Sequence, residues 1–205
     1  MHNGIAQSHS TTAPLRPVSA IDTTSDDRLV QWIGTGNKLA MQVLFARYHV
    51  RVYRFILRSV GNAAVAEDLT SDVFLSVWRQ ADRFQARSTV STWLLAIARH
   101  KAISELRRRR EEQIDVSEIE LEDPADDPEI ACQKQDRRET VRHCLMRLSP
   151  DQREIIDLAY YHGKSVEEVA EIIGIPRNTV KTRMFRARKR LSEMLEDAGV
   201  ISAVA

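Results

Sequence analysis

The chain has 205 residues, of which 43% are hydrophobic and 29% are charged, enough for one large domain or two small ones with buried cores. Only 7 Gly and 6 Pro are present, so a turn-rich all-β fold is not expected, and the abundance of Leu, Ala, Glu, Arg and Ile is typical of helices. No apolar run is long enough to span a bilayer, and the N-terminus lacks the apolar segment of a secretory signal. We therefore expect an all-α cytoplasmic protein without membrane insertion.

The formal net charge of +1 hides blocks of opposite sign. Residues 83–110 carry eight Lys or Arg against a single Glu, and residues 177–190 carry seven Lys or Arg and no acid. Between these blocks, residues 111–129 carry ten acidic side chains and no Lys or Arg. Two basic segments separated by an acidic one indicate a polyanionic partner that is contacted at two places.

The two cysteines, Cys132 and Cys144, do not indicate a disulfide framework or a metal site. Neither belongs to a CxxC pair, and His143 next to Cys144 points to a different side of a helix. We expect no metal and no cofactor, and a reducing environment.

The first half of the chain predicts a tail followed by four helices. Residues 1–24 are rich in Ser, Thr and Pro and have no hydrophobic periodicity, which is typical of a disordered tail. Apolar residues then recur at helical spacing, and Gly61 ends one of these segments as a C-cap should. Because short loops join the four helices, they should form one module over residues 25–110. The helices are expected near 25–33 and over 39–60, 64–79 and 91–110.

An acidic linker is predicted over residues 111–135, where Pro124 and Pro128 interrupt any helix. Two dozen extended residues would span roughly 80 Å, so the modules on either side could lie far apart on a long target. The second module should cover residues 136–197, followed by a tail over 198–205. Ser149 and Pro150 there open a helix with a capping box.

The segment SVEEVAEIIGIPRNTVKTRMFRARKRL predicts a helix-turn-helix. Ser165 opens its first helix with a capping box, Gly174 supplies the turn, and Pro176 precedes a long second helix. The second helix carries side chains that read base edges and phosphates in a major groove, although a solvated basic face is the plainer alternative. The predicted DNA-binding residues are Arg177, Asn178, Thr179, Lys181, Thr182, Arg183, Arg186 and Arg188.

A second nucleic-acid surface is predicted where the first module mixes aromatic and basic residues. Phe84 and Trp93 could stack unpaired bases while Arg87 and Lys101 hold the backbone. A core Trp93 below a solvated basic face is the alternative interpretation.

These segments resemble bacterial extracytoplasmic-function (group four) sigma factors of the sigma-70 family. GNAAVAEDLTSDVFLSVWRQADRF followed by STWLLAIARHKAISELRRR resembles their region two, and LSPDQREIIDLAYYHGKSVEEVAEIIGIPRNTVKTRMFRARKRL resembles their region four. The resemblance covers about residues 38–110 and 136–195. It implies a transcription factor without enzymatic activity that gives core RNA polymerase its promoter specificity in a stress or signal response.

The resemblance also implies partners and roles for particular residues. The partners are core RNA polymerase, through its β′ clamp helices and β flap, promoter DNA, and an anti-sigma protein. The helix-turn-helix would read the minus-thirty-five element. The residues implied to dock on the clamp helices are Glu67, Asp68, Leu69, Ser71, Asp72 and Phe74. The residues implied to bind the minus-ten element are Arg83, Phe84, Arg87, Ser88, Trp93, His100, Lys101 and Arg107.

Three positions depart from the family pattern, and two other function classes stay open. Gln, Asn and Asp are usual at the positions of Ser71, His100 and Ser104. These departures leave open how strongly the chain docks on the polymerase and which base sequence its minus-ten element has. The first alternative is a stand-alone helix-turn-helix regulator of the response-regulator type, although the N-terminal half shows no strand pattern for a receiver domain. The second is a helical enzyme or interaction module, in which the clamp-docking acids only solubilise their helix.

Overall fold

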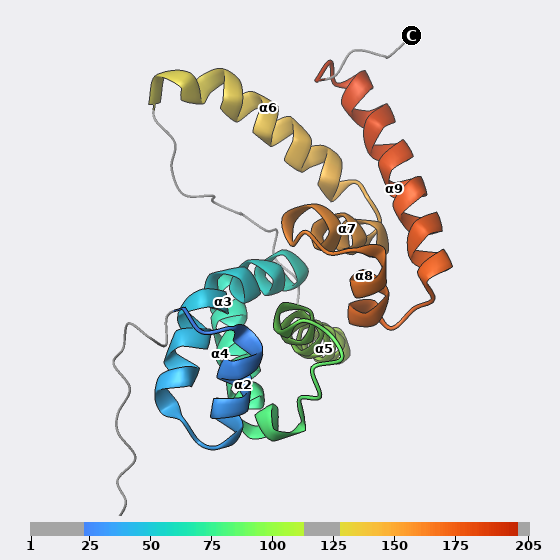
Figure 1. Cartoon of the computed structure of the whole chain (residues 1–205). Coiled ribbons are helices and arrows are strands. Elements are labelled where there is room, and N and C mark those ends of the chain that lie inside the picture. Colours follow the sequence, from blue (N-terminus) through green and yellow to red (C-terminus); the bar gives the residue numbers. More distant parts are fainter. Residues whose placement is uncertain (1–22, 113–127, 201–205) are drawn as a thin grey trace, which may run out of the picture.

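Eight α-helices and no strands are found in residues 23–112 and 128–200, the ranges that this computed structural model describes (Figure 1). In the second range, side chains are described from residue 137 onward. The all-α fold predicted from composition is confirmed. Most of the expected N-terminal tail, the middle of the expected linker and the last five residues lie outside the described ranges. The helices are α2 (Asp26–Gly34), α3 (Lys38–Val60), α4 (Ala63–Gln80), α5 (Val90–Glu111), α6 (Pro128–Met146), α7 (Pro150–Ile156), α8 (Val166–Ile173) and α9 (Arg177–Asp197).

Local capping residues place the ends of the helices in the first half. The side chains of Asn37 and Asn62 each accept a hydrogen bond of 3.0 Å from a backbone N–H in the first turn, at the starts of α3 and α4. Thr89 does the same at the start of α5. Each of these side chains satisfies a donor that the helix itself leaves unpaired. Gly61 has φ of 69° and ends α3 in the left-handed conformation that favours glycine.

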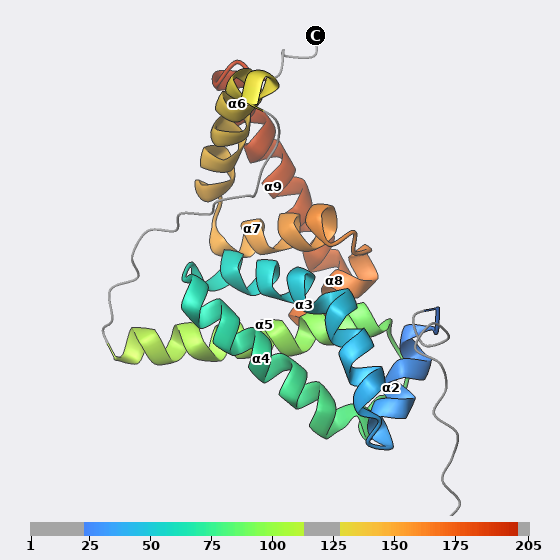
Figure 2. The same ribbon diagram turned by 90° about the vertical axis from the view of Figure 1, so that its left-hand side faces the viewer.

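Helices α2 to α5 enclose one apolar core. Leu29 of α2, Phe55 and Ile56 of α3, Val77 of α4 and Leu94 of α5 are fully or almost fully buried. Helix α3 packs against both α4 and α5, and α5 runs across the module beneath α3 (Figure 2). A single 3₁₀ turn, η1 (Ala81–Arg83), leads from α4 into the loop before α5.

The second half begins earlier than the sequence indicates. Helix α6 starts at Pro128, inside the expected linker of residues 111–135, because proline is tolerated in the first helical turn. Both predicted capping boxes are present, at Ser149 and Ser165. Helix α7 continues into a π-helical segment, η2 (Asp157–Tyr161), so that the helical stretch ends at Tyr161. Helices α6 and α9 pair at the far end of the molecule around Cys144, Leu148 and Met194.

The two halves pack against each other through a shared core. Leu158 and Val169 of the second half belong to the same apolar cluster as Leu94 and Leu95 of α5. Helices α7 and α8 rest on α3 and α5, while α6 and α9 extend away from the first half (Figure 2). The sequence left room for widely separated modules, whereas the structure places them in direct contact.

Candidate nucleic-acid and polymerase interfaces

The helix-turn-helix is built from α8, a glycine turn and α9. At the start of α8, Glu168 N–H donates to Ser165 Oγ at 3.2 Å and Ser165 N–H donates to Glu168 Oε2 at 3.0 Å. Gly174 ends α8 with φ of 76°, which allows the sharp turn into α9. Val180 is fully buried, and Met184 and Ala187 continue the same buried stripe along α9. This stripe fixes which face of α9 points outward.

The outward face of α9 carries the residues predicted to read DNA. Arg183 pairs with Asp151 at 2.8 Å, and the guanidinium of Arg177 lies 3.5 Å from Glu167. Within the described ranges, the side chains of Lys181 and Arg186 make no hydrogen bond or ion pair. Thr179 and Arg183 are half-buried. The exposed members of the predicted set are Arg177, Asn178, Lys181, Thr182, Arg186 and Arg188.

Two exposed aromatic side chains lie beside this basic face and were not singled out from the sequence. Phe185 is 69% exposed and Tyr160 is 59% exposed. The guanidinium of Arg188 lies 5.6 Å from the centre of the Tyr160 ring, within cation–π range. The exposure of Phe185 could have been predicted, because its position in the sequence lies outside the buried stripe of α9. The exposure of Tyr160 could not, because it depends on the π-helical segment.

The predicted polymerase-docking residues lie along α4. Glu67, Asp68, Ser71 and Asp72 are exposed and Leu69 is half-buried. Phe74 is buried, so it can support this face from below but does not project from it. Its ring meets that of Phe45 edge-on, with the ring centres 4.8 Å apart.

The residues predicted for the minus-ten element lie on the loop before α5 and on α5 itself. The rings of Phe84 and Trp93 are 4.9 Å apart, so the two aromatics form one half-buried pair. Ala86 in the same loop has φ of 50°, which residues other than glycine seldom adopt, and the loop is therefore held in an unusual conformation. Ser88 and Lys101 are also half-buried. The exposed members of the set are Arg83, Arg87, His100 and Arg107.

Most cations of α5 already have carboxylate partners. Arg107 pairs with Glu111 at 3.2 Å, and Lys101 lies 3.9 Å from Asp72 of α4. Arg108 and Arg109 both donate to Glu105. The hydrogen bond from Arg108, helped by that from Arg109, lowers the pKa of Glu105 although burial acts in the opposite direction. A strand that binds to α5 must therefore exchange places with these carboxylates.

Comparison with known proteins assigns both halves of the chain. Residues 44–112 match the family model for Sigma-70 region 2, and residues 138–191 match the model for Sigma-70 region 4. The chain is 30% identical over 181 residues to the RNA polymerase sigma-H factor of Pseudomonas aeruginosa, covering 83% of this chain and 94% of that protein. It is 31% identical over 181 residues to the ECF RNA polymerase sigma factor SigK of Mycobacterium ulcerans, covering 84% of this chain and 95% of that protein. The chain belongs to the ECF RNA polymerase sigma factors.

Solved structures place the fold of this sigma factor in the same family. RpoE from Bartonella quintana, in its complex with the anti-sigma factor NepR, matches with a TM-score of 0.58 at 30% identity, over 76% of this chain and 96% of that one. CnrH in complex with the cytosolic domain of CnrY matches with a TM-score of 0.63 at 24% identity, over 85% of this chain and 99% of that one, which shows a common fold. The three departures from the family pattern, Ser71, His100 and Ser104, are all exposed in this sigma factor.

No other kind of site emerges from the described ranges of this sigma factor. Within them, no group of three or more His, Cys, Asp or Glu side chains is placed to hold a metal ion. None of the helices in these ranges is long and apolar enough to cross a bilayer.

Proposed function

We propose that this ECF sigma factor divides promoter recognition between its two halves. Residues 25–110 would bind core RNA polymerase through α4 and the minus-ten element through the 84–91 loop and α5. Residues 136–197, with α6 extending this half back to Pro128, would bind the minus-thirty-five element through α9. The observation that carries the proposal is the separation of exposed charge, with carboxylates along α4 and cations along α9.

Exposed charged side chains suit both the polymerase contact proposed for α4 and the DNA contact proposed for α9. Carboxylates such as Asp68 and Asp72 attract a basic partner surface and exclude an acidic one, which favours clamp helices that present cations. Lys181 and Arg186 can meet phosphates without first breaking an ion pair, whereas Asn178 and Thr182 near the start of α9 are suited to base edges.

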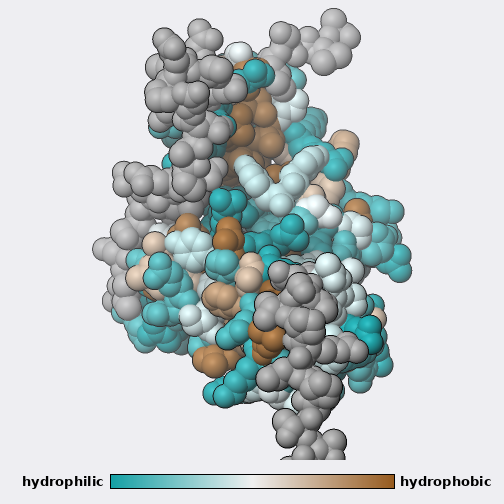
Figure 3. Space-filling view, turned by 60° about the vertical axis from the view of Figure 1, so that its left-hand side comes forward, coloured by the Kyte–Doolittle hydropathy of each residue, from teal (hydrophilic) through white to brown (hydrophobic). Residues whose placement is uncertain are grey.

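An apolar seam supports the β flap as a further contact of the second half. Leu145, Leu191 and Leu195 lie half-buried where α6 and α9 pair. The space-filling view has a brown area in the upper part of the molecule, where these two helices stand, with teal surface below it (Figure 3). The exposed parts of these apolar side chains can contact a partner protein.

The likeness to RpoE of Bartonella quintana, whose structure holds the anti-sigma factor NepR, supports an anti-sigma protein as a regulatory partner of this chain. The proposed role is that of a non-enzymatic initiation factor acting in the cytoplasm, where the polymerase transcribes, in a stress or signal response. A stand-alone regulator would bind DNA without the polymerase and has no need of the α4 carboxylates.

The test is binding to sigma-free core RNA polymerase, measured by fluorescence anisotropy. Asp68→Arg/Asp72→Arg should weaken binding by about 100-fold, because like charges at a docking surface cost several kcal/mol. Asp27→Arg/Asp82→Arg makes the same change in net charge on exposed positions of the first half that belong to no proposed polymerase contact, and should bind like the wild type. Tight wild-type binding that both double variants retain would disprove the α4 assignment, and no binding by folded wild type would disprove the polymerase role.

A further inference from the structure

A polar network joins α8 to the first turn of α5. The Lys164 ammonium group, which is 5% exposed, donates to Ser91 Oγ at 2.5 Å and to Thr92 Oγ1 at 2.9 Å. It also pairs with Glu168 at 2.9 Å. Thr92 and Thr89 in turn donate their hydroxyl hydrogens to Glu168 Oε1, at 2.6 Å and 3.2 Å. A single carboxylate of the second half is thus held by the hydroxyl groups that begin α5.

The Glu168 carboxylate occupies a place suited to an anion. It lies at the N-terminus of α5, where the helix dipole and unpaired N–H groups favour negative charge. Burial raises its pKa, but hydrogen bonds from Thr92, Lys164 and the Ser165 backbone outweigh burial and hold the pKa at about 2. Glu168 therefore stays negatively charged across the physiological pH range.

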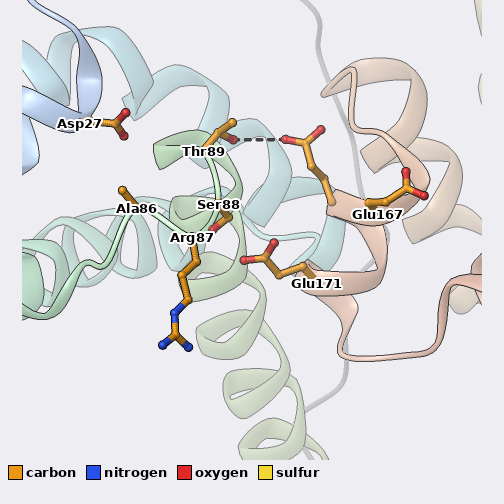
Figure 4. A pocket seen from close by; sticks show the side chains of 8 residues that line it. Asp27, Ala86, Arg87, Ser88, Thr89, Glu167 and Glu171 are labelled. Carbon is orange, nitrogen blue, oxygen red and sulfur yellow. Dashed lines mark hydrogen bonds between the residues drawn. The ribbon is translucent and has the colours of Figure 1, made fainter.

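A second carboxylate of α8, that of Glu171, extends toward the loop that is proposed to hold the minus-ten strand (Figure 4). Glu171 lines one side of a pocket whose other side is formed by Arg87, Ser88 and Thr89. Glu167 also borders this pocket, but its carboxylate turns away from the loop and lies 3.5 Å from Arg177. In the same view, the dashed line joins Thr89 to Glu168 across the pocket. The acidic side of α8 thus lies over the loop from which the first half would contact a nucleic-acid backbone.

Two further ion pairs hold the halves together beside this contact. Arg99 of α5 donates to both carboxylate oxygens of Glu154, at 2.7 Å and 3.2 Å. Arg58 of α3 lies 2.5 Å from the Asp157 carboxylate and 3.0 Å from His162 Nε2. All of these partners come from opposite halves, so the contact extends from the start of α5 to the end of α3.

This arrangement is incompatible with promoter binding by both halves. The minus-ten and minus-thirty-five elements lie about 25 bp apart, or roughly 85 Å of duplex at about 3.4 Å per base pair. In the structure, a side chain of α8 and one of α5 are 2.6 Å apart. The two halves must separate before α9 and the 84–91 loop can reach their elements together.

We propose that α8 is an internal cover for the minus-ten loop, in which Glu168 and Glu171 take the place of nucleic-acid phosphates beside Arg87, Ser88 and Thr89. The free sigma factor is closed in this way, and the loop becomes available for single-stranded DNA only when the halves separate. The proposal rests on the proposed function, since it assumes that this loop holds the minus-ten strand.

The variants that test the cover change only the second half. Glu168→Gln/Glu171→Gln removes two charges and leaves Glu167, the partner of Arg177, in place. Glutamine at position 168 keeps the side-chain carbonyl that the Ser165 capping box needs. Glu193→Gln/Asp197→Asn is the matched control, because it removes two exposed carboxylates of the same half far along α9. The control accounts for any gain in DNA affinity that follows from net charge alone.

Two measurements on the full chain test whether α8 covers the minus-ten loop. Anisotropy of fluorescein-labelled single-stranded dT20 should show about tenfold tighter binding for the α8 variant than for wild type, and less than a twofold change for the control. Small-angle X-ray scattering should show a larger radius of gyration for the α8 variant alone. Equal behaviour of the two variants overturns the proposal, as does a rise in affinity without expansion or expansion without a rise in affinity.

Binding of the wild type to core RNA polymerase separates failure of the cover from failure of the proposed function. If the wild type binds core polymerase while the α8 variant behaves like its control, the cover is wrong and the sigma role stands. If folded wild type does not bind core polymerase, the proposed function fails whatever the scattering shows.

Discussion

The two basic helices, α5 and α9, look alike in the sequence but differ in the state of their cations. In α5, Arg107, Arg108 and Arg109 all pair with carboxylates of the same helix, and Arg99 pairs with Glu154 of the other half. In α9, Lys181 and Arg186 have no side-chain partner among the described residues.

The difference shows that a basic segment does not by itself measure the charge that is available to DNA. Lys181 and Arg186 of α9 can neutralise phosphates at once and release counterions. Those of α5 must first leave their carboxylates, at a cost of about 0–1 kcal/mol for each exposed pair. Helix α9 is therefore ready for duplex DNA, whereas α5 becomes fully available only when a strand displaces its internal partners.

The largest expected effect comes from removing the unpaired cations of α9. Lys181→Ala/Arg186→Ala should reduce the salt dependence of binding to a 30-bp duplex by about 2 in log–log slope, since each lost phosphate contact contributes about 0.9. Two lost contacts change the slope by about 1.8, so that relative to 1 M salt binding at about 0.1 M should be roughly 60-fold weaker. The measurement is fluorescence anisotropy over a salt series.

A matching double variant of α5 tests whether internal ion pairs limit the binding of its cations to DNA. Arg108→Ala/Arg109→Ala removes the same charge from cations that are already neutralised by Glu105. We expect less than a threefold loss of duplex affinity. A loss as large as that of the α9 pair would show that internal ion pairs do not limit the availability of the α5 cations.

A smaller effect is expected from releasing the α5 cations. Glu105→Gln should tighten binding of single-stranded dT20 about threefold, because Arg108 and Arg109 lose the carboxylate that both contact. Glu111→Gln is the control, since among the described residues Glu111 pairs with the largely exposed Arg107 alone. Equal responses of the two variants, measured by anisotropy, would contradict a special role of Glu105.

The last expected effect concerns stability and not DNA affinity, and it is the pH dependence of the Glu168 contact. A folded-state pKa of about 2, against an ordinary value of 4.5, means that the ionised carboxylate stabilises the fold fully above pH 4.5. That stabilisation should be lost as the pH falls from about 4.5 toward 2. The stability difference between wild type and Glu168→Gln, from urea unfolding, should be constant between pH 8 and pH 5 and then shrink. A difference that changes between pH 8 and pH 5 would contradict this assignment.

Residues close together in the sequence determined the local structure of this protein. The capping residues Asn37, Asn62, Ser149 and Ser165 and the glycine at position 174 act within about four positions of the helix ends that they define. The helix-turn-helix follows from the same short-range rules together with a buried stripe at helical spacing. Because these features are local, the family resemblance could be recognised from the sequence alone.

The tertiary structure alone decided which of these elements touch and which charges are neutralised. Glu154 meets Arg99 from 55 positions away, and Lys164 meets Thr92 from 72 positions away. The sequence likewise left Pro128 in a linker, because acidic residues surround it, although helix α6 starts there. Hydrophobic periodicity shows which face of a helix is buried but does not name the partner, since contacts between distant segments depend on how whole helices pack.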